Sequence, residues 1–342
     1  MLFARTWRNA VWTVCAFGLL ALPLPISSVS TAEAAASSTK ATRTTTNRKV
    51  SAAQAARARR ARLAQARAAA RARELQELAT PRFKLDEAGM LVPDVRAEAA
   101  IIYNPQTQQI LWSANADEER SIASMTKIMT AAVFLEDDPD FTTEAVVQRA
   151  DVRGANTTFL RAGERVRLDD LLHLMLVASD NAAARLLSRS TSHGDSSAFI
   201  ARMNEKAQEL GLTHTRFTDP SGLDAGNVST AREMAGLIAF SSADERIANV
   251  MRKNEYRLQT NRRTIEVHST NQLLENADID VRGGKTGFIS KAGYCIATLL
   301  QLPQSSQQIA VVVLGARSNA ARFMETRHLF NWFTGKLVVP EN

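Results

Sequence analysis

Cysteine is scarce in this chain of 342 residues, which contains only Cys15 and Cys295. Cys15 falls in a leader that we expect to be removed, so an internal disulfide is excluded and a hydrophobic core must stabilise the fold. Cys295 lies in the apolar run 294–297, which predicts a buried small hydrophobic residue rather than a nucleophile. Hydrophobic residues make up 45% of the chain, and its length suits one large domain or two modest ones.

Metal-binding and nucleotide-binding patterns are also missing. The five histidines show no short ligand spacing, so no metal site is predicted at His173, His193, His214, His268 or His328. The tripeptide Gly284-Lys285-Thr286 imitates the end of a nucleotide-binding P-loop, but the glycine required five positions earlier is Ile279. The sequence therefore excludes an ATPase of that type.

Acidic residues are absent from residues 40–73, which carry eleven lysines and arginines. The net charge of the whole chain is +7, which is less than the +11 of this segment alone. The remaining residues therefore have a net negative charge, and residues 74–342 are mildly acidic. A basic patch spread over a folded domain is typical of nucleic-acid binding, but here the excess charge sits in a tail-like stretch. We therefore expect no nucleic-acid partner.

Residues 1–36 have the pattern of a secretion signal peptide. Two arginines precede an apolar run over residues 10–29, and alanine-rich cleavage sites follow around residues 32–36. An uncleaved membrane anchor is the alternative, but Pro23 and Pro25 interrupt the run. The pattern predicts an exported protein that works in the periplasm or another extracytoplasmic space.

Residues 37–80 have the composition of a stalk. Residues 37–49 are rich in serine and threonine and are expected to be uncompacted, whereas residues 50–79 are almost entirely Ala, Arg, Gln and Leu. The second composition favours a helix but holds too little apolar mass for a core, and the Thr80-Pro81 step ends it. Two roles stay open: a solvated spacer, and an electrostatic contact with the cell wall or a membrane surface.

Residues 81–342 are expected to form the globular domain, with a core over about residues 97–333. A β-hairpin is predicted at residues 99–112, and further strands at 293–300 and 308–314. Helical periodicity predicts helices at residues 128–135, 168–177, 182–187, 199–210, 230–240 and 320–333. Strands at both ends and helices between them predict an α+β fold of two lobes, with one sheet built from both chain ends and an inserted all-α lobe.

Three short motifs carry the chemistry. In Ser124-Met125-Thr126-Lys127, the serine and lysine lie about one helical turn apart, so the amine can take the hydroxyl proton. Ser179-Asp180-Asn181 lies on a loop between two helices, and Lys285-Thr286-Gly287 begins a strand-like run. A cation and a hydroxyl followed by glycine suit a strand that binds a peptide carboxylate. Each motif alone is weak, because Ser37-Ser38-Thr39-Lys40 matches the first by chance.

In this order, the motifs Ser-x-x-Lys, Ser-Asp-Asn and Lys-Thr-Gly form the signature set of penicillin-binding proteins and class A β-lactamases. Further segments resemble the low-molecular-mass D-alanyl-D-alanine carboxypeptidase and endopeptidase family, at residues 217–224, 229–231, 285–288 and 292–295. The resemblance covers about residues 97–333. It implies a β-lactamase/transpeptidase-like fold with an antiparallel sheet of about five strands, a serine peptidase acting on peptidoglycan stem peptides, covalent inhibition by β-lactam antibiotics, and no cofactor.

The resemblance also implies a role for each motif residue. Ser124 would attack the carbonyl of the penultimate D-alanine, and Lys127 would act as its base. The amine of Lys127 must be neutral, which a nearby Lys285 and partial burial would favour by lowering its pKa. Ser179 would relay a proton to the leaving amine, and the backbone N–H groups of Ser124 and Phe288 would form the oxyanion hole.

Substrate binding is implied for the remaining motif residues. Asn181 would hold the substrate backbone, and Lys285 and Thr286 would bind its carboxylate. Gly287 would place no side-chain bulk beside the bound peptide, and Phe288 is the last residue that the resemblance implies for substrate binding.

Alternatives remain within and outside this family. A class A-like β-lactamase needs a Glu-x-x-Asn motif to activate water for deacylation, and no asparagine between Asn181 and Lys285 has a glutamate three positions before it. A catalytically silent wall-binding module gives no reason to retain the complete Ser/Lys/Ser/Lys set. The Ser-Asp-Asn form and the short C-terminal segment favour an endopeptidase over a carboxypeptidase.

Overall fold

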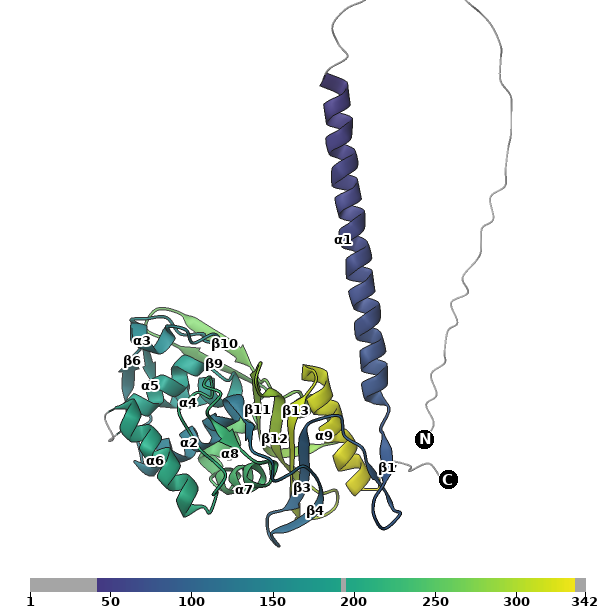
Figure 1. Ribbon diagram of the computed structural model, residues 1–342. Coiled ribbons are helices and arrows are strands. Elements are labelled where there is room, and N and C mark those ends of the chain that lie inside the picture. Colours follow the sequence, from purple (N-terminus) through teal and green to yellow (C-terminus); the bar gives the residue numbers. More distant parts are fainter. Residues whose placement is uncertain (1–41, 192–194, 336–342) are drawn as a thin grey trace, which may run out of the picture. The chain divides into compact units, whose positions relative to one another are not determined.

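The computed structural model describes residues 42–191 and 195–335 (Figure 1). The predicted signal peptide, residues 1–36, lies outside the described residues. By its contacts the chain divides into residues 1–66 and 67–342, a boundary inside helix α1 (Thr42–Ala79). The helix begins eight residues before the alanine-rich run, because extending a helix costs far less than starting one. No helix of the described part is long and apolar enough to cross a membrane.

A five-stranded antiparallel sheet forms the centre of the domain, in the order β11-β12-β13-β3-β4. Its strands come from both ends of the domain sequence: β3 (Ala99–Asn104), β4 (Gln109–Ala114), β11 (Asp280–Ile289), β12 (Gly293–Gln301) and β13 (Gln308–Ala316). The two ends meet where β13 pairs with β3, with Val312 opposite Ile101. This confirms the predicted α+β fold and the sheet built from both chain ends.

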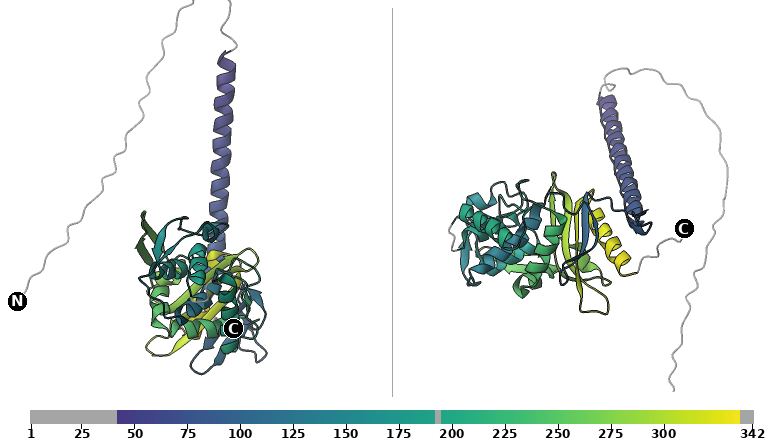
Figure 2. Two further views of the ribbon diagram at one scale, coloured as in Figure 1. Left: turned by 90° about the vertical axis from the view of Figure 1, so that its left-hand side faces the viewer. Right: turned by 60° about the horizontal axis from the view of Figure 1, so that its bottom comes forward.

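Both faces of the sheet are covered, which explains the nearly unbroken apolar sequence of β13. One face packs on α9 (Asn319–Phe333), whose Leu329 and Phe330 join Ile102 and Val311 in a shared cluster. The other face packs on α7 (Ala231–Ser242) and the helical lobe. Figures 1 and 2 show the lobe and α9 (yellow) on opposite sides of the sheet.

The inserted lobe is built around α2, which is buried along its whole length except for its last residue. The predicted helices are confirmed, and most of their predicted ends lie within two residues of the observed ends. The helices of the domain before α9 are α2 (Lys127–Glu136), α3 (Arg149–Val152), α4 (Leu168–Val177), α5 (Asn181–Arg189), α6 (Ser196–Glu209), α7 and α8 (Glu245–Met251). Short 3-10 turns lie at η1 (Ala123–Thr126) and η2 (Gln272–Glu275).

The sequence predicted an all-α lobe, but the lobe also contains β-strands. Two antiparallel strand pairs lie within it: β6 (Glu144–Val146) with β7 (Arg165–Arg167), and the hairpin of β9 (Glu255–Gln259) with β10 (Thr264–His268). In β10 only every second side chain is buried, a period that five residues are too few to reveal against their charged neighbours. Smaller pairs complete the domain: β1 (Phe83–Leu85) with β2 (Leu91–Pro93), and β5 (Arg120–Ser121) with β8 (Val228–Ser229).

Candidate active site

The serine of the first motif lies in the 3-10 turn η1, and its lysine is the first residue of α2. Ala123, just before Ser124, has a φ of +49°, a conformation that costs energy for a residue with a side chain. Two glycines from distant segments hold this turn. A Cβ on Gly222, whose φ is +80°, would lie 2.0 Å from the carbonyl oxygen of Ala123, and one on Gly287 would lie 2.7 Å from that of Ile122.

The amine of Lys127 is completely buried and lies at the centre of the site. It donates to Ser124 Oγ at 2.9 Å, to Asn181 Oδ1 at 2.6 Å and to the Ser221 carbonyl at 2.5 Å. The serine and lysine predicted as a pair are therefore in direct contact. Asn181 is fixed in turn, because its Nδ2 donates to the Ala155 carbonyl at 2.7 Å.

Burial lowers the pKa of Lys127 to about 7, and the carboxylates of Asp219 and Asp180 oppose this shift. The nearby cation that lowers this pKa further is Arg185. The sequence had predicted burial as one cause, which is confirmed, although the burial is complete rather than partial. It had predicted Lys285 as the second cause, whereas the cation that lowers this pKa is Arg185. The helical lobe removes the amine from water entirely, and desolvation is the largest effect.

The second motif forms the tight connection between α4 and α5. Ser179 has a φ of +60°, and its Oγ accepts a hydrogen bond from Lys285 Nζ at 2.9 Å. Asp180 caps α5 by accepting from the Ala183 N–H at 2.9 Å. Its other oxygen accepts from the Phe159 N–H at 2.6 Å, which ties the loop before it to the cap.

The third motif lies in the middle of β11, not at the start of a strand as predicted. β11 is the edge strand of the sheet, so its free side faces the serine turn. Lys285 is buried, and the pKa of its amine lies well below the usual value because of burial and then because of repulsion by Lys127 and Arg322. Thr286 Oγ1 lies 2.6 Å from Thr270 Oγ1, whereas Phe288 is half exposed and stacks on Tyr294.

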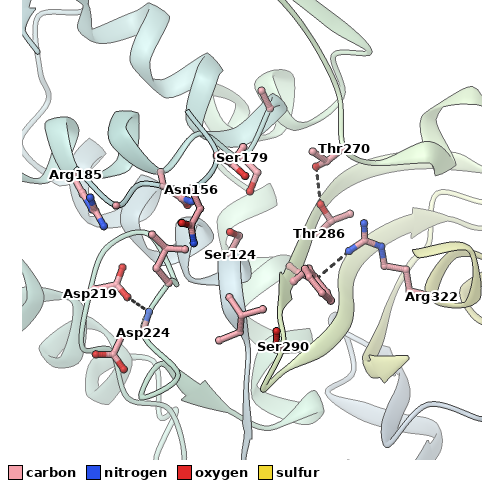
Figure 3. A pocket seen from close by; sticks show the side chains of 18 residues that line it. Ser124, Asn156, Ser179, Arg185, Asp219, Asp224, Thr270, Thr286, Ser290 and Arg322 are labelled. Atoms are coloured by element: carbon pink, nitrogen blue, oxygen red, sulfur yellow. Dashed lines mark hydrogen bonds between the residues drawn. The ribbon is translucent and has the colours of Figure 1, made fainter. Parts of the chain in front are cut away.

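These elements enclose a cavity of about 770 Å³ (Figure 3). Six of the predicted site residues line it: Ser124, Ser179, Asn181, Thr286, Gly287 and Phe288. The amines of Lys127 and Lys285 lie just behind its wall, each bonded to a lining serine. The structure therefore brings all eight predicted residues together. In the part of the chain that it describes, no three His, Cys, Asp or Glu side chains gather to hold a metal ion.

Sequence reasoning missed several residues of the site. Arg322, from α9, lines the cavity although its side chain is almost fully buried, and it donates to the carbonyls of Gly287 and Cys295 at 3.0 and 3.2 Å. Burial lowers its pKa to about 10. A single arginine in a helix near the C-terminus carries no sequence signal for such a place.

Asp219 was part of the resemblance but had no predicted role. Its carboxylate accepts from both the N–H and the hydroxyl of Ser221 at 2.6 Å, and from Gly222, Asp224 and Asn227 at 2.7 to 2.8 Å. Although burial alone would raise it, these hydrogen bonds hold the pKa of Asp219 below its usual value. The residue shapes the loop that carries the Ser221 carbonyl to Lys127.

Comparisons with known proteins agree with this site. A family model described as D-alanyl-D-alanine carboxypeptidase matches residues 86–318. The chain is 31% identical over 234 residues to the D-alanyl-D-alanine endopeptidase of Haemophilus influenzae, covering 68% of this chain and 80% of that protein.

Solved structures are similar over the same region. The Streptomyces K15 DD-transpeptidase matches with a TM-score of 0.66 and 27% identity, over 72% of this chain and 99% of that one. Penicillin-binding protein D2 from Listeria monocytogenes, solved in the cefotaxime-bound form, matches with a TM-score of 0.62 and 28% identity, over 70% and 97% of the two chains. The predicted transpeptidase-like fold is thereby confirmed.

Proposed function

From the premise that this chain belongs to the D-alanyl-D-alanine carboxypeptidase family of penicillin-binding serine peptidases, we propose that Ser124 is its acylated nucleophile. The observation that carries the assignment is the buried amine of Lys127, 2.9 Å from Ser124 Oγ, with a pKa of about 7. At neutral pH about half of such amines are unprotonated, so the base is available without metal or histidine.

In the acylation step, neutral Lys127 takes the hydroxyl proton while Ser124 Oγ attacks the carbonyl carbon of the penultimate D-alanine. The negative oxygen that forms is bound by the backbone N–H groups of Ser124 and Phe288. The bond between carbonyl carbon and leaving nitrogen then breaks, and that nitrogen receives a proton through Ser179, whose hydroxyl is bonded to Lys285. The proton held by Lys127 after the attack balances the one delivered.

Substrate binding falls to the other lining residues. Thr286 offers a hydroxyl and Lys285 a nearby amine to the carboxylate of the peptide, and binding this anion would favour the charged form of Lys285. The Asn181 amide orients both the substrate backbone and Lys127, to which it is bonded at 2.6 Å. Gly287 keeps the edge of β11 free of side-chain bulk beside Ser124.

Hydrolysis of the acyl-enzyme distinguishes this enzyme from the class A-like β-lactamase alternative. Such a β-lactamase needs a glutamate to activate water. The carboxylates among the lining residues are Asp219, which is occupied by five hydrogen bonds, and the exposed Asp224. We therefore expect a β-lactam to acylate Ser124 and to leave slowly.

The favoured reaction is cleavage of the D-alanyl cross-link between two stem peptides, an endopeptidase activity. The similarity to the Haemophilus influenzae endopeptidase over 80% of its length supports this choice, as does the Ser-Asp-Asn form of the second motif. Carboxypeptidase activity, the removal of a terminal D-alanine, is the second candidate because the matching family model carries that description.

Mass spectrometry of the purified chain tests the proposal. The protein is incubated separately with a D-Ala-D-Ala pentapeptide, a cross-linked muropeptide dimer and penicillin. Conversion of dimer to monomers is the expected result, together with a penicillin adduct that Ser124→Ala lacks. Loss of one alanine from the pentapeptide alone would select the carboxypeptidase instead. No reaction with any of the three would revive the silent wall-binding module.

The remaining proposals concern the N-terminal segments. We propose that residues 1–36 are a cleaved signal peptide, that the enzyme acts outside the cytoplasm on its wall substrate, and that residues 37–80 are a stalk before the domain at 81–342. The supports are the leader pattern in the sequence and the exposed side chains of α1 from residue 52 to 77, among them seven arginines and two glutamates. Such a helix suits contact with anionic wall polymer or lipid headgroups.

A further inference from the structure

The buried amine of Lys127 has three hydrogen-bond partners, and only one of them can itself donate. The Ser221 carbonyl oxygen, at 2.5 Å, can only accept. Asn181 Oδ1, at 2.6 Å, also accepts, because the nitrogen of the same amide donates to the Ala155 carbonyl. The third partner, Ser124 Oγ at 2.9 Å, is a hydroxyl and can donate as well as accept. The serine therefore differs in kind from the other two partners.

The charge of the amine decides which of its atoms faces the serine. A protonated lysine has three N–H donors, one for each partner, whereas the neutral amine has two N–H donors and one lone pair. When the Ser221 carbonyl and the Asn181 amide take both donors, the lone pair is left for the Ser124 hydroxyl. If the Ser221 carbonyl moved away, the amine could turn an N–H toward Ser124 and would then be unable to take its proton. The position of this carbonyl thus decides whether the base is aimed.

The carboxylate of Asp219 fixes the loop that carries this carbonyl. Its Oδ1 accepts from the N–H and the hydroxyl of Ser221, both at 2.6 Å, and from the Gly222 N–H at 2.8 Å. Its Oδ2 accepts from Asn227 Nδ2 at 2.8 Å and from the Asp224 N–H at 2.7 Å, the bond drawn in Figure 3. One side chain therefore ties together both ends of the loop 219–227.

The same loop is fastened to the two elements that carry the serine and the lysine. Thr130, in the first turn of α2, is buried and donates its hydroxyl to the Pro220 carbonyl at 2.6 Å. The Asn227 carbonyl accepts from the N–H of Ile122, which leads into the serine turn, at 3.0 Å. The loop is thus held at fixed points on both sides of the residue that contacts the amine.

From these contacts we infer that Asp219 is a positioning residue for the acylation step. Through the loop that it fixes, it keeps the Ser221 carbonyl on the amine of Lys127. The lone pair of that amine is thereby aimed at Ser124. The inference rests on the proposed function, in which Lys127 is the base, and it gives a role to a carboxylate that transfers no proton itself.

The charges around the amine provide a readout that a merely structural role would not give. The carboxylates of Asp219 and Asp180 raise the pKa of Lys127. Burial and Arg185 lower it, and Lys285 is a further cation coupled to this amine. Asp219→Asn removes an anion while the amine stays buried, so the midpoint of the acylation rate should move to lower pH. If the loop only kept water out, its loss would hydrate the amine and move the midpoint to higher pH.

Stopped-flow labelling of the full chain with a fluorescent penicillin, from pH 5 to pH 9, tests the role. Asp219→Asn should slow acylation on the high-pH plateau by a factor of about 10 to 100, the scale of a misplaced catalytic group, and lower the midpoint. Thr130→Val removes the hydroxyl that holds Pro220 but no charge, so the plateau rate should fall while the midpoint stays. Asp117→Asn removes a carboxylate that pairs with Arg232 outside the cavity and should match wild type in both.

Two results for Asp219→Asn would overturn the positioning role: an unchanged plateau rate, or a slower rate with its midpoint at higher pH. If this variant fails to fold, Thr130→Val decides. A normal plateau rate in Thr130→Val would show that the loop does not aim the base, and a slow one at the wild-type midpoint would support the role. All of these results leave the peptidase function intact. Only the absence of a penicillin adduct on Ser124 in wild type would overturn the proposed function itself.

Discussion

The rate of Ser124 acylation is expected to depend on pH through the charge of Lys127. The amine must be neutral to act as a base, and its pKa is lowered to about 7 by burial. The rate should therefore fall as the pH drops through this value. A single titration with that pKa leaves about half of the amine neutral at pH 7 and about 1% at pH 5. The structure thus predicts acylation about 50-fold slower at pH 5 than at pH 7.

Stopped-flow labelling with a fluorescent penicillin, under conditions where the rate is proportional to reagent concentration, reports the ionisation of the free enzyme. The carboxylate of the reagent stays ionised from pH 5 to pH 8, so the change belongs to the protein. Arg185→Gln removes a cation that lowers the pKa of Lys127, and the midpoint should move to higher pH. Arg232→Gln, outside the cavity, should leave the midpoint unchanged.

Two results would refute this reasoning. A rate that is flat between pH 5 and pH 8 would show that Lys127 does not change charge in the range that its burial requires. A midpoint that moves to lower pH in Arg185→Gln would show that the sign of the electrostatic coupling is wrong. The first result would remove Lys127 as the base of the acylation step, and the second would remove Arg185 as a cause of its lowered pKa.

Three further predictions concern other parts of the molecule. Lys127→Ala should slow penicillin acylation by a factor on the order of 10² to 10⁴, and an unchanged rate constant would exclude it as general base. Gly222→Ala should abolish labelling, because its Cβ would lie 2.0 Å from the Ala123 carbonyl, whereas Gly89→Ala, at a φ of +76° with open space around it, should label normally. Normal labelling of both would mean that the serine turn tolerates displacement. Deleting residues 37–66 should leave kcat/KM on a soluble peptide unchanged and weaken binding to isolated wall, most clearly at low salt; equal wall binding by both proteins would make the segment a spacer.

Much of the fold could be predicted because its signals are local. The apolar periodicity of residues 168–177 predicted α4 with the bounds that the structure has. Two short apolar runs separated by the turn residues 104–107 predicted the hairpin β3-β4. The hairpin β9-β10 was missed because each strand has only five residues, and polar or charged residues alternate with the few buried apolar ones. Regular elements with a long apolar face are readable, and short surface pairs held by neighbouring helices are not.

The site shows the same division between local and distant signals. Ser124 and Lys127 could be paired because one helical turn separates them, and the other two motifs because their order matches a known signature. The burial of Lys127, which sets its pKa, comes from a whole lobe packing around α2. Arg185 and Arg322 reach the cavity from helices whose relative positions no spacing in the sequence encodes.

The pairing of β13 with β3 joins residues about 200 positions apart in the chain, Val312 with Ile101 for example. Such a contact closes a very long loop before it contributes any stability, so the central sheet forms slowly and late. The serine turn is held by Gly287 of β11, the first of three sheet strands that follow the helical lobe in the chain. Reactivity toward penicillin should therefore appear only with the slowest refolding phase, and a ribosome-bound chain that stops before β11 should remain unreactive.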